Sequence, residues 1–152
     1  MTKNLEAFLD TIAFAEGTYG RGDNGYNVLV GGTLFDSYAD HPGKRIWIGR
    51  WNIWSTAAGR YQILKRYYAA YKKILKLPDF SPASQDAIAI RMIKEQGAFM
   101  DIERGRIRDA IRKCRNIWAS FPGAGYGQRE HNVEELLRFY VSAGGTLHDS
   151  PT

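Results

Sequence analysis

Apolar residues near the start of the chain recur at the spacing of one helical face. Leu5, Phe8, Leu9 and Ile12 stand at i, i+3, i+4 and i+7, which is the pattern of an amphipathic helix with one buried side. The pattern predicts a helix over residues 4–16. Gly17 and Gly20 follow directly, and glycine is a common residue just beyond a helix end.

Similar periodicity predicts four more helices from residue 61 onward. Their expected ranges are 61–75, 82–96, 104–114 and 129–143. Ser81 and Pro82 suit the cap and the first position of the second of these helices, and Gly97 suits its end. Gly144 and Gly145 end the last helix.

Between the first helix and the others, residues 18–62 are rich in glycine and lack helical periodicity. Tyr26–Val30 and Thr33–Phe35 are β-prone and flank Gly31-Gly32, a spacing that predicts a hairpin. A third short strand is expected near residues 60–62. With no repeat and no linker in the chain, the expected fold is α+β. It is one domain over residues 1–152, with a helical lobe and a small antiparallel β lobe.

Composition limits the class of protein. The chain has 152 residues, of which 44% are hydrophobic and 24% charged, as in ordinary globular domains. No apolar run is long enough to span a bilayer, no secretory signal is apparent, and the single cysteine excludes an internal disulfide. The 21 basic and 16 acidic residues give a formal net charge of +5, which favours an anionic partner.

Glu16 is the strongest candidate for chemistry. It lies four residues after Ile12 and therefore returns to the apolar face of the first helix. Desolvation there and the negative helix end would both raise the pKa of its carboxyl group. A glutamate that is protonated near neutral pH suits general acid catalysis of glycoside cleavage. The alternative is a side chain that turns into solvent at a frayed helix end.

Glycoside hydrolysis usually needs a second carboxylate. The candidates in the predicted β lobe are Asp23, Asp36 and Asp40, and no pattern singles out one of them. Some enzymes of this kind instead use a group of the substrate in place of the protein nucleophile. The absence of a marked partner for Glu16 is compatible with such chemistry.

Several segments together resemble the lambda-type endolysin family of bacteriophages, which are lysozyme-like lytic transglycosylases. The resemblance covers nearly the whole chain in order. Its pieces are Ala15-Glu16-Gly17, Val30-Gly31-Gly32, Asp40-His41-Pro42, Ala58-Gly59-Arg60-Tyr61-Gln62, Asp79-Phe80-Ser81-Pro82, Ser84-Gln85-Asp86-Ala87, Asn116-Ile117-Trp118-Ala119-Ser120 and Pro122-Gly123-Ala124-Gly125-Tyr126-Gly127-Gln128.

The resemblance implies a lysozyme-like fold with a cleft between the lobes. It also implies cleavage of peptidoglycan between N-acetylmuramic acid and N-acetylglucosamine, with Glu16 as acid and then base and a 1,6-anhydro sugar as product. The expected sugar contacts are Ser55, Thr56, Tyr61, Gln62, Tyr126 and Gln128. No cofactor or metal is implied.

The family also implies how the protein reaches its substrate. We expect a monomer that is made in the host cytoplasm, is released with the help of a holin and acts on the wall in the periplasm, without stable membrane insertion. One departure from the family pattern is the segment 45–54, which holds Trp47, Trp51 and Trp54. We expect Trp51 and Trp54 on a lip of the cleft, with one of them against sugar.

Three other functions compete with this interpretation. A lysozyme-type hydrolase would differ only in the fate of the oxocarbenium-like intermediate. A nucleic-acid binder would use the basic stripe of Arg104, Arg108, Arg112 and Arg115, but it leaves Glu16 unexplained. A zinc amidase would need ligands from His41, His131, His148 and Cys114, and no two of these stand at a typical ligand spacing.

Overall fold

The computed structural model describes residues 1–123 and 131–148. Its chain separates into two compact units, the first formed by Met1–Ala15 and Ile90–Thr152 and the second by Glu16–Ala89. The element order is α1 (Lys3–Glu16), β1 (Ile46–Ile48), β2 (Ile53–Ser55), α2 (Lys65–Leu75), α3 (Pro82–Glu95), α4 (Phe99–Glu103), α5 (Ile107–Cys114) and α6 (Val133–Ser142). The expectation of one domain over residues 1–152 stays a prediction.

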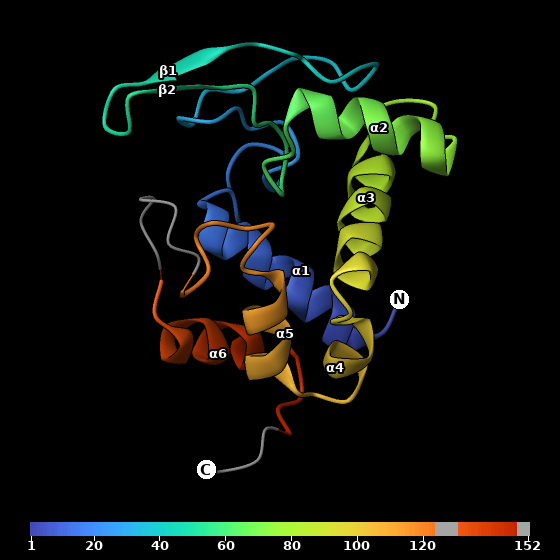
Figure 1. The fold of residues 1–152 in the computed structure, drawn as a ribbon, viewed down its shortest axis with the longest axis vertical. Helices are drawn as coiled ribbons and strands as arrows, with labels where there is room; N and C mark the ends of the chain where they lie inside the picture. The colour runs from blue at the N-terminus through green and yellow to red at the C-terminus, as the bar shows by residue number, and fades with distance from the viewer. Residues whose placement is uncertain (124–130, 149–152) are drawn as a thin grey trace. The chain divides into compact units, whose positions relative to one another are not determined.

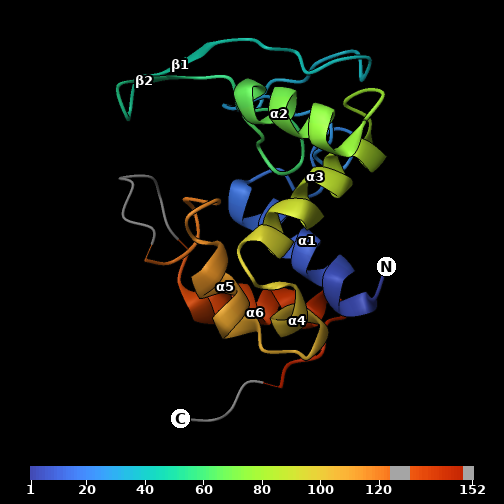
Figure 2. The ribbon, with the colours of Figure 1, turned by 45° about the vertical axis from the view of Figure 1, so that its right-hand side comes forward.

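The first unit is helical, and α4, α5 and α6 gather beside α1 in both views (Figures 1 and 2). The predicted apolar face of α1 is buried. Phe8 meets Phe121 edge to face, with ring centroids 6.1 Å apart, and Phe14 stacks on Phe139 of α6 at 4.4 Å. Burial of Phe8 and Phe121 and the stacking of Phe14 on Phe139 contribute to the stability of the unit.

A buried carboxylate joins α4 to α5. Asp101 accepts hydrogen bonds from Arg106 Nε at 3.0 Å and from Lys113 Nζ at 2.7 Å. Burial alone would raise the pKa of Asp101, but the two cations outweigh it and hold the pKa below its usual value. The charge is therefore paired on both sides, as a buried carboxylate requires.

The second unit holds the only sheet among the described residues, an antiparallel pair of β1 and β2. Trp47 stands opposite Trp54, and Ile46 stands opposite Ser55. A four-residue loop, Gly49–Asn52, joins the strands, and Asn52 takes a positive φ of 54° in it. This hairpin and α2, both labelled in Figure 1, belong to the second unit. The predicted β lobe over residues 18–62 lies within this unit.

The predicted hairpin is present as a short bridged turn, and the regular strands lie elsewhere in the unit. Tyr26–Val30 and Thr33–Phe35 do pair across Gly31-Gly32: Val28 bridges Leu34, and Leu29 N and Phe35 N donate to the carbonyls of Thr33 at 2.7 Å and Asn27 at 2.9 Å. The pairing does not extend into a regular ladder, and Leu29 also bridges Ala58. The strands form instead at residues 46–48 and 53–55, where bulky β-branched and aromatic residues pair across the turn. The expected strand near residues 60–62 is a bridge between Ala58 and Ile63.

Helices were predicted in the correct regions of the chain, but their first and last residues were predicted less accurately. The first helix and the helix from Pro82 are confirmed. α2 begins at Lys65 and not at residue 61, because Gln62 has a φ of 52° that no helix accommodates. Gly105, with a φ of 76°, separates α4 from α5. Within the described ranges, no helix has the length and apolar character needed to cross a bilayer.

Candidate active site

Glu16 is the last residue of α1 and is half-buried. Ala15 before it is buried, and Gly17 after it has a φ of 78°. A glycine in this left-handed conformation ends a helix without the penalty a side chain would bring. The carboxylate predicted from helical periodicity therefore lies at the point where the chain leaves the helix.

The segment after Glu16 is held by a buried hydroxyl group. Thr18 is buried, and its Oγ1 donates to the carbonyl of Arg60 at 2.6 Å. Gly25 packs against the same threonine, where an added Cβ would lie 2.8 Å from the Thr18 carbonyl oxygen. Two elements that were predicted separately, Glu16 and the segment Gly59–Gln62, are thus linked within the second unit.

Arg60 is a buried cation within a shell of backbone groups and rings. Its Nε donates to the carbonyl of Asn24 at 3.0 Å, and its backbone N–H donates to Gln85 Oε1 at 2.9 Å. The guanidinium carbon lies 5.4 Å from the ring centroid of Tyr26 and 5.7 Å from that of Tyr61. Aromatic faces attract a desolvated guanidinium, so Arg60 organises this part of the unit.

Tyr61 was predicted as a sugar contact, but it is only 1% exposed. Its hydroxyl donates to Asp86 Oδ1 at 2.6 Å and accepts from Arg60 at 3.3 Å. Tyr26 donates to the same carboxylate oxygen at 2.9 Å. Burial, aided by the charge of Asp86, raises the pKa of Tyr61 well above its usual value. The structure therefore makes Tyr61 a supporting residue of the core.

Gln62 combines a left-handed backbone with an inward-directed amide. Its Nε2 donates to the carbonyls of Gly59 at 2.9 Å and Val28 at 3.2 Å. These two acceptors fix the amide orientation, and the side chain is half-buried. Gly59 cannot carry a side chain here, because a Cβ would lie 2.2 Å from Gln85 Oε1.

Ser55 and Thr56 line one surface hollow of about 550 Å³ together with Trp54 and residues of α2. Thr56 Oγ1 also accepts from the backbone N–H of Lys65 at 3.0 Å, so it satisfies a free donor at the start of α2. Ser55 Oγ accepts from the N–H of Ala57 at 3.1 Å. Both hydroxyls are half-buried. Tyr126 and Gln128 lie outside the described residues.

The three aspartates considered as partners of Glu16 differ in their surroundings. Asp23 Oδ2 accepts from the hydroxyl of Tyr38 at 2.6 Å. Asp40 Oδ1 accepts from the backbone N–H of His41 at 2.9 Å. Asp36 is exposed. Two of the three carboxylates therefore already hold loop conformations.

Two of the residues considered for zinc, His41 and Cys114, are buried in the fold. His41 Nε2 lies 2.8 Å from the carbonyl of Ile63, and its Nδ1 accepts from Gly43 N at 2.9 Å. This pairing requires the neutral ring, and burial lowers the pKa of His41. Burial raises the pKa of Cys114 to about 12. Throughout residues 1–123 and 131–148, no three His, Cys, Asp or Glu side chains gather as a metal site.

The arginine stripe considered for nucleic acid is partly neutralised. Arg108 pairs with Glu134 at 2.7 Å, and Arg112 pairs with Asp109 at 2.9 Å. These ion pairs lie on the exposed surface and contribute little to stability. They do reduce the positive charge that the stripe presents to an anion.

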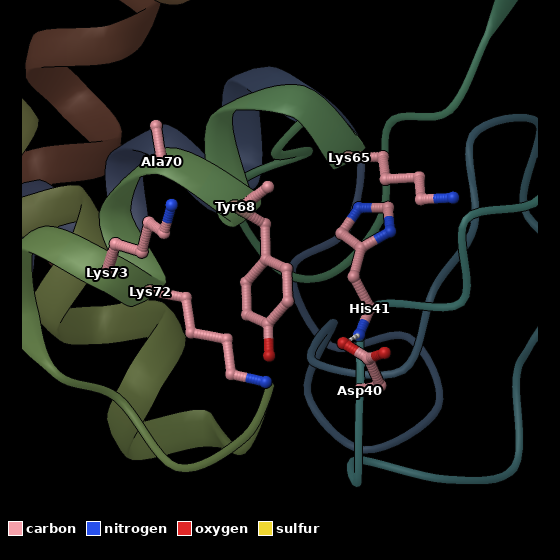
Figure 3. A pocket seen from close by; sticks show the side chains of 8 residues that line it. Asp40, His41, Lys65, Tyr68, Ala70, Lys72 and Lys73 are labelled. Atoms are coloured by element: carbon pink, nitrogen blue, oxygen red, sulfur yellow. Dashed lines mark hydrogen bonds between the residues drawn. The ribbon is translucent and has the colours of Figure 1, made fainter.

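A second hollow, of about 510 Å³, was not predicted from the sequence. Asp40, His41, Tyr68 and lysines of α2 line it, as Figure 3 shows. Tyr68 is buried, and its hydroxyl has no hydrogen-bond partner among the described residues. Burial raises the pKa of Tyr68 to about 12, with Asp40 adding to the effect.

Sequence reasoning also missed the supporting residues Gln85 and Asp86 on α3. Gln85 is buried and bonds the backbone at three points: the Arg60 N–H and the carbonyls of Tyr26 and Phe80. A signal was present, because Gln85 lies three residues before the buried Ile88. A polar residue on the apolar face of a helix indicates a specific partner.

Comparisons with known proteins agree with this architecture. The solved structure of bacteriophage lambda lysozyme complexed with a chitohexasaccharide superposes with a TM-score of 0.95 at 50% identity, covering 97% of this chain and 98% of that one. A second structure of lysozyme from bacteriophage lambda gives a TM-score of 0.89 at 49% identity. The protein therefore has the lysozyme-like α+β fold.

The sequence comparisons narrow this class to one family. A family model described as endolysin matches residues 6–147. The endolysin of Escherichia phage lambda is 53% identical over 148 residues, which cover 95% of this chain and 93% of the lambda protein. The endolysin of Escherichia phage P2 is 49% identical, with 94% of each chain covered. The chain belongs to the endolysin family, whose members lyse the cell wall.

Proposed function

We propose that this endolysin cleaves the glycan strands of peptidoglycan as a lytic transglycosylase, with Glu16 as the catalytic acid and base. The observation that carries the proposal is the position of Glu16 at the end of α1, linked through Thr18 to the Gly59–Gln62 segment. Family membership adds support, since the lambda relative was solved with a chitohexasaccharide.

The proposed reaction needs one carboxyl group. Glu16 donates its proton to the oxygen between N-acetylmuramic acid and N-acetylglucosamine, and the bond from that oxygen to C1 of the muramic acid breaks. The Glu16 carboxylate then takes the proton of the 6-hydroxyl of the same muramic acid. The 6-oxygen bonds to C1 and closes a 1,6-anhydro ring. Glu16 ends protonated, and no water is consumed.

A lysozyme-type hydrolase on the same fold is the competing function. It would need a carboxylate that activates water or attacks C1. Asp23 is hydrogen-bonded to Tyr38, and Asp40 is bonded to its own turn. The engagement of these two in loop structure favours the reaction that uses Glu16 alone and leaves the exposed Asp36 as the candidate for a hydrolase.

The proposed sugar contacts follow from exposure and available atoms. Gln62, Ser55 and Thr56 are half-buried, and Ser55 and Thr56 line the hollow of about 550 Å³. Tyr126 and Gln128 are proposed on the resemblance alone. Tyr61 is assigned a supporting role, because its buried hydroxyl is already bonded to Asp86 and Arg60.

Digestion of purified peptidoglycan in heavy-oxygen water tests the mechanism. A transglycosylase leaves muramic acid ends that are lighter by one water than hydrolysed ends, carry no label and have no reducing power. A Glu16→Gln variant serves as the control. It should remain folded and lose about 10²- to 10⁴-fold in rate, since it cannot donate the proton. Labelled reducing ends would establish the hydrolase instead.

The remaining proposals concern the setting of the reaction. We propose a monomer without metal or cofactor, made in the host cytoplasm and admitted to the periplasm with the help of a holin. Lysis of purified walls should then be insensitive to chelators. Expression without a holin should leave cells intact while their extracts remain active.

A further inference from the structure

The distribution of charge along the chain is uneven, and the second unit carries the excess. Residues 41–78 hold nine lysines and arginines and no aspartate or glutamate. The other 114 residues hold 12 basic and 16 acidic residues. The net positive charge of this protein therefore comes entirely from one continuous segment, which includes β1, β2 and α2.

Within this segment the hairpin exposes large apolar side chains. Trp54 is 56% exposed and Trp47 is 46% exposed, and they stand opposite one another with ring centroids 5.3 Å apart. Ile53 beside them is 41% exposed. Such side chains are not buried by the fold of this unit, although their exposure to water is unfavourable.

Basic side chains accompany the exposed rings. The guanidinium carbon of Arg45 lies 4.9 Å from the ring centroid of Trp54, and that of Arg50 lies 5.7 Å from a ring centroid of Trp51. On α2, Arg66 lies 5.0 Å from the ring of Tyr67 in the same way. Paired cations and amphipathic rings are typical of protein surfaces that bind at the lipid headgroup level.

α2 continues the same surface. Tyr68 is its only buried residue, whereas Tyr67 and Ile74 are exposed between basic residues. The hollow of about 550 Å³ is lined from both the hairpin and α2, so the two elements adjoin. Lys65, Lys72 and Lys73 also line the other hollow, beside Tyr68 (Figure 3). We name the exposed faces of Arg45–Trp54 and Lys65–Leu75 the basic aromatic surface.

We propose that the basic aromatic surface binds the headgroup region of an anionic lipid bilayer. Charge complementarity supports a lipid, since no carboxylate in the segment opposes an anionic headgroup. Exposed tryptophan and isoleucine side chains supply apolar area that enters the interface. No described helix can span a bilayer, so the binding is peripheral.

Vesicle sedimentation with the full chain tests this proposal. One set of vesicles contains about one third phosphatidylglycerol in phosphatidylcholine, and the other contains phosphatidylcholine alone. We expect binding to the anionic vesicles, a blue shift of tryptophan fluorescence and weakening with salt. Binding that is absent, or equal for both vesicle types, would overturn the proposal.

Two charge variants with the same net charge locate the binding. The test variant combines Arg45→Gln with Arg50→Gln. The control variant, in the first unit, combines Arg104→Gln with Arg112→Gln. Each variant lowers the formal net charge of +5 by two. The first pair should weaken anionic vesicle binding roughly 10- to 30-fold, since each cation near a lipid surface contributes substantially. The second pair should change it less than about twofold. Equal losses would show a general charge effect and refute the assignment.

The double variant Trp47→Ala with Trp54→Ala separates lipid from other anionic partners. Loss of vesicle binding and of the blue shift, with the melting temperature checked, supports the lipid surface. Unchanged vesicle binding with a raised KM on purified peptidoglycan would make these rings a glycan site. Tighter binding to duplex DNA than to anionic vesicles at equal ionic strength would make the surface a general polyanion site. Either result overturns the proposal.

Discussion

Replacing Tyr61 by phenylalanine removes one hydroxyl group and keeps the buried ring. That hydroxyl donates to the Asp86 carboxylate at 2.6 Å and accepts from Arg60 at 3.3 Å. Hydrogen bonds to charged groups contribute about 1.5–3 kcal/mol when one partner is removed from a buried site. For a chain of this size each kcal/mol changes the melting temperature by about 2–4 °C, so we expect a decrease of roughly 3–12 °C.

The same variant decides between support and direct sugar contact. Thermal melting and the KM for purified peptidoglycan are measured together. Tyr67→Phe is the matched control, because Tyr67 is 44% exposed on α2 and its hydroxyl change should cost less than about 0.5 kcal/mol. If Tyr61→Phe melts like the wild type while KM rises severalfold, Tyr61 contacts sugar and the supporting role is wrong.

Two further predictions concern charge and pH. Burial lowers the pKa of His41 below 6.5, so the unfolded chain binds more protons below that pH. The melting temperature should therefore fall between about pH 7 and pH 5, and His41→Gln should flatten this dependence; an unchanged slope would contradict it. Asp101→Asn should cost about 1–3 kcal/mol in urea unfolding at pH 7, because it leaves Lys113 and Arg106 without their buried partner. The lowered pKa of Asp101 means that this difference should shrink as the pH falls below about 4, whereas the exposed Glu134→Gln should show little difference at either pH.

Helical periodicity predicted more of this fold than turn signals did. The apolar face of α1 and the Ser81-Pro82 start of α3 follow from local spacing and capping, and both are present. Gly31-Gly32 also gave a strong local signal, and the chain does reverse there, but its neighbours make isolated bridges and no regular ladder. A two-residue turn indicates where a chain reverses, while a ladder depends on which side chains find partners across it.

The candidate site was likewise predicted from the sequence only in part. Glu16 was identified because its position on the helix face is a property of sequence spacing alone. The surroundings of Tyr61 could not be predicted in this way, since they depend on Asp86 of α3, 25 residues further along the chain. A conspicuous tyrosine next to Gln62 suggested a ligand contact, and only the tertiary contacts revealed that its hydroxyl is already bonded inside the unit.

A carboxylate at a helix end needs an anchor outside the helix, because the regular hydrogen bonds of the helix stop there. Thr18 supplies this anchor two residues after Glu16 by bonding the carbonyl of Arg60. The backbone N–H of Arg60 is in turn held by Gln85 of α3. We therefore expect the position of the proposed catalytic acid to depend on a buried network formed by Thr18, Arg60 and Gln85. Since most of that network is too distant in sequence to produce a periodic pattern, a glutamate can be recognised from the sequence while the residues that position it cannot.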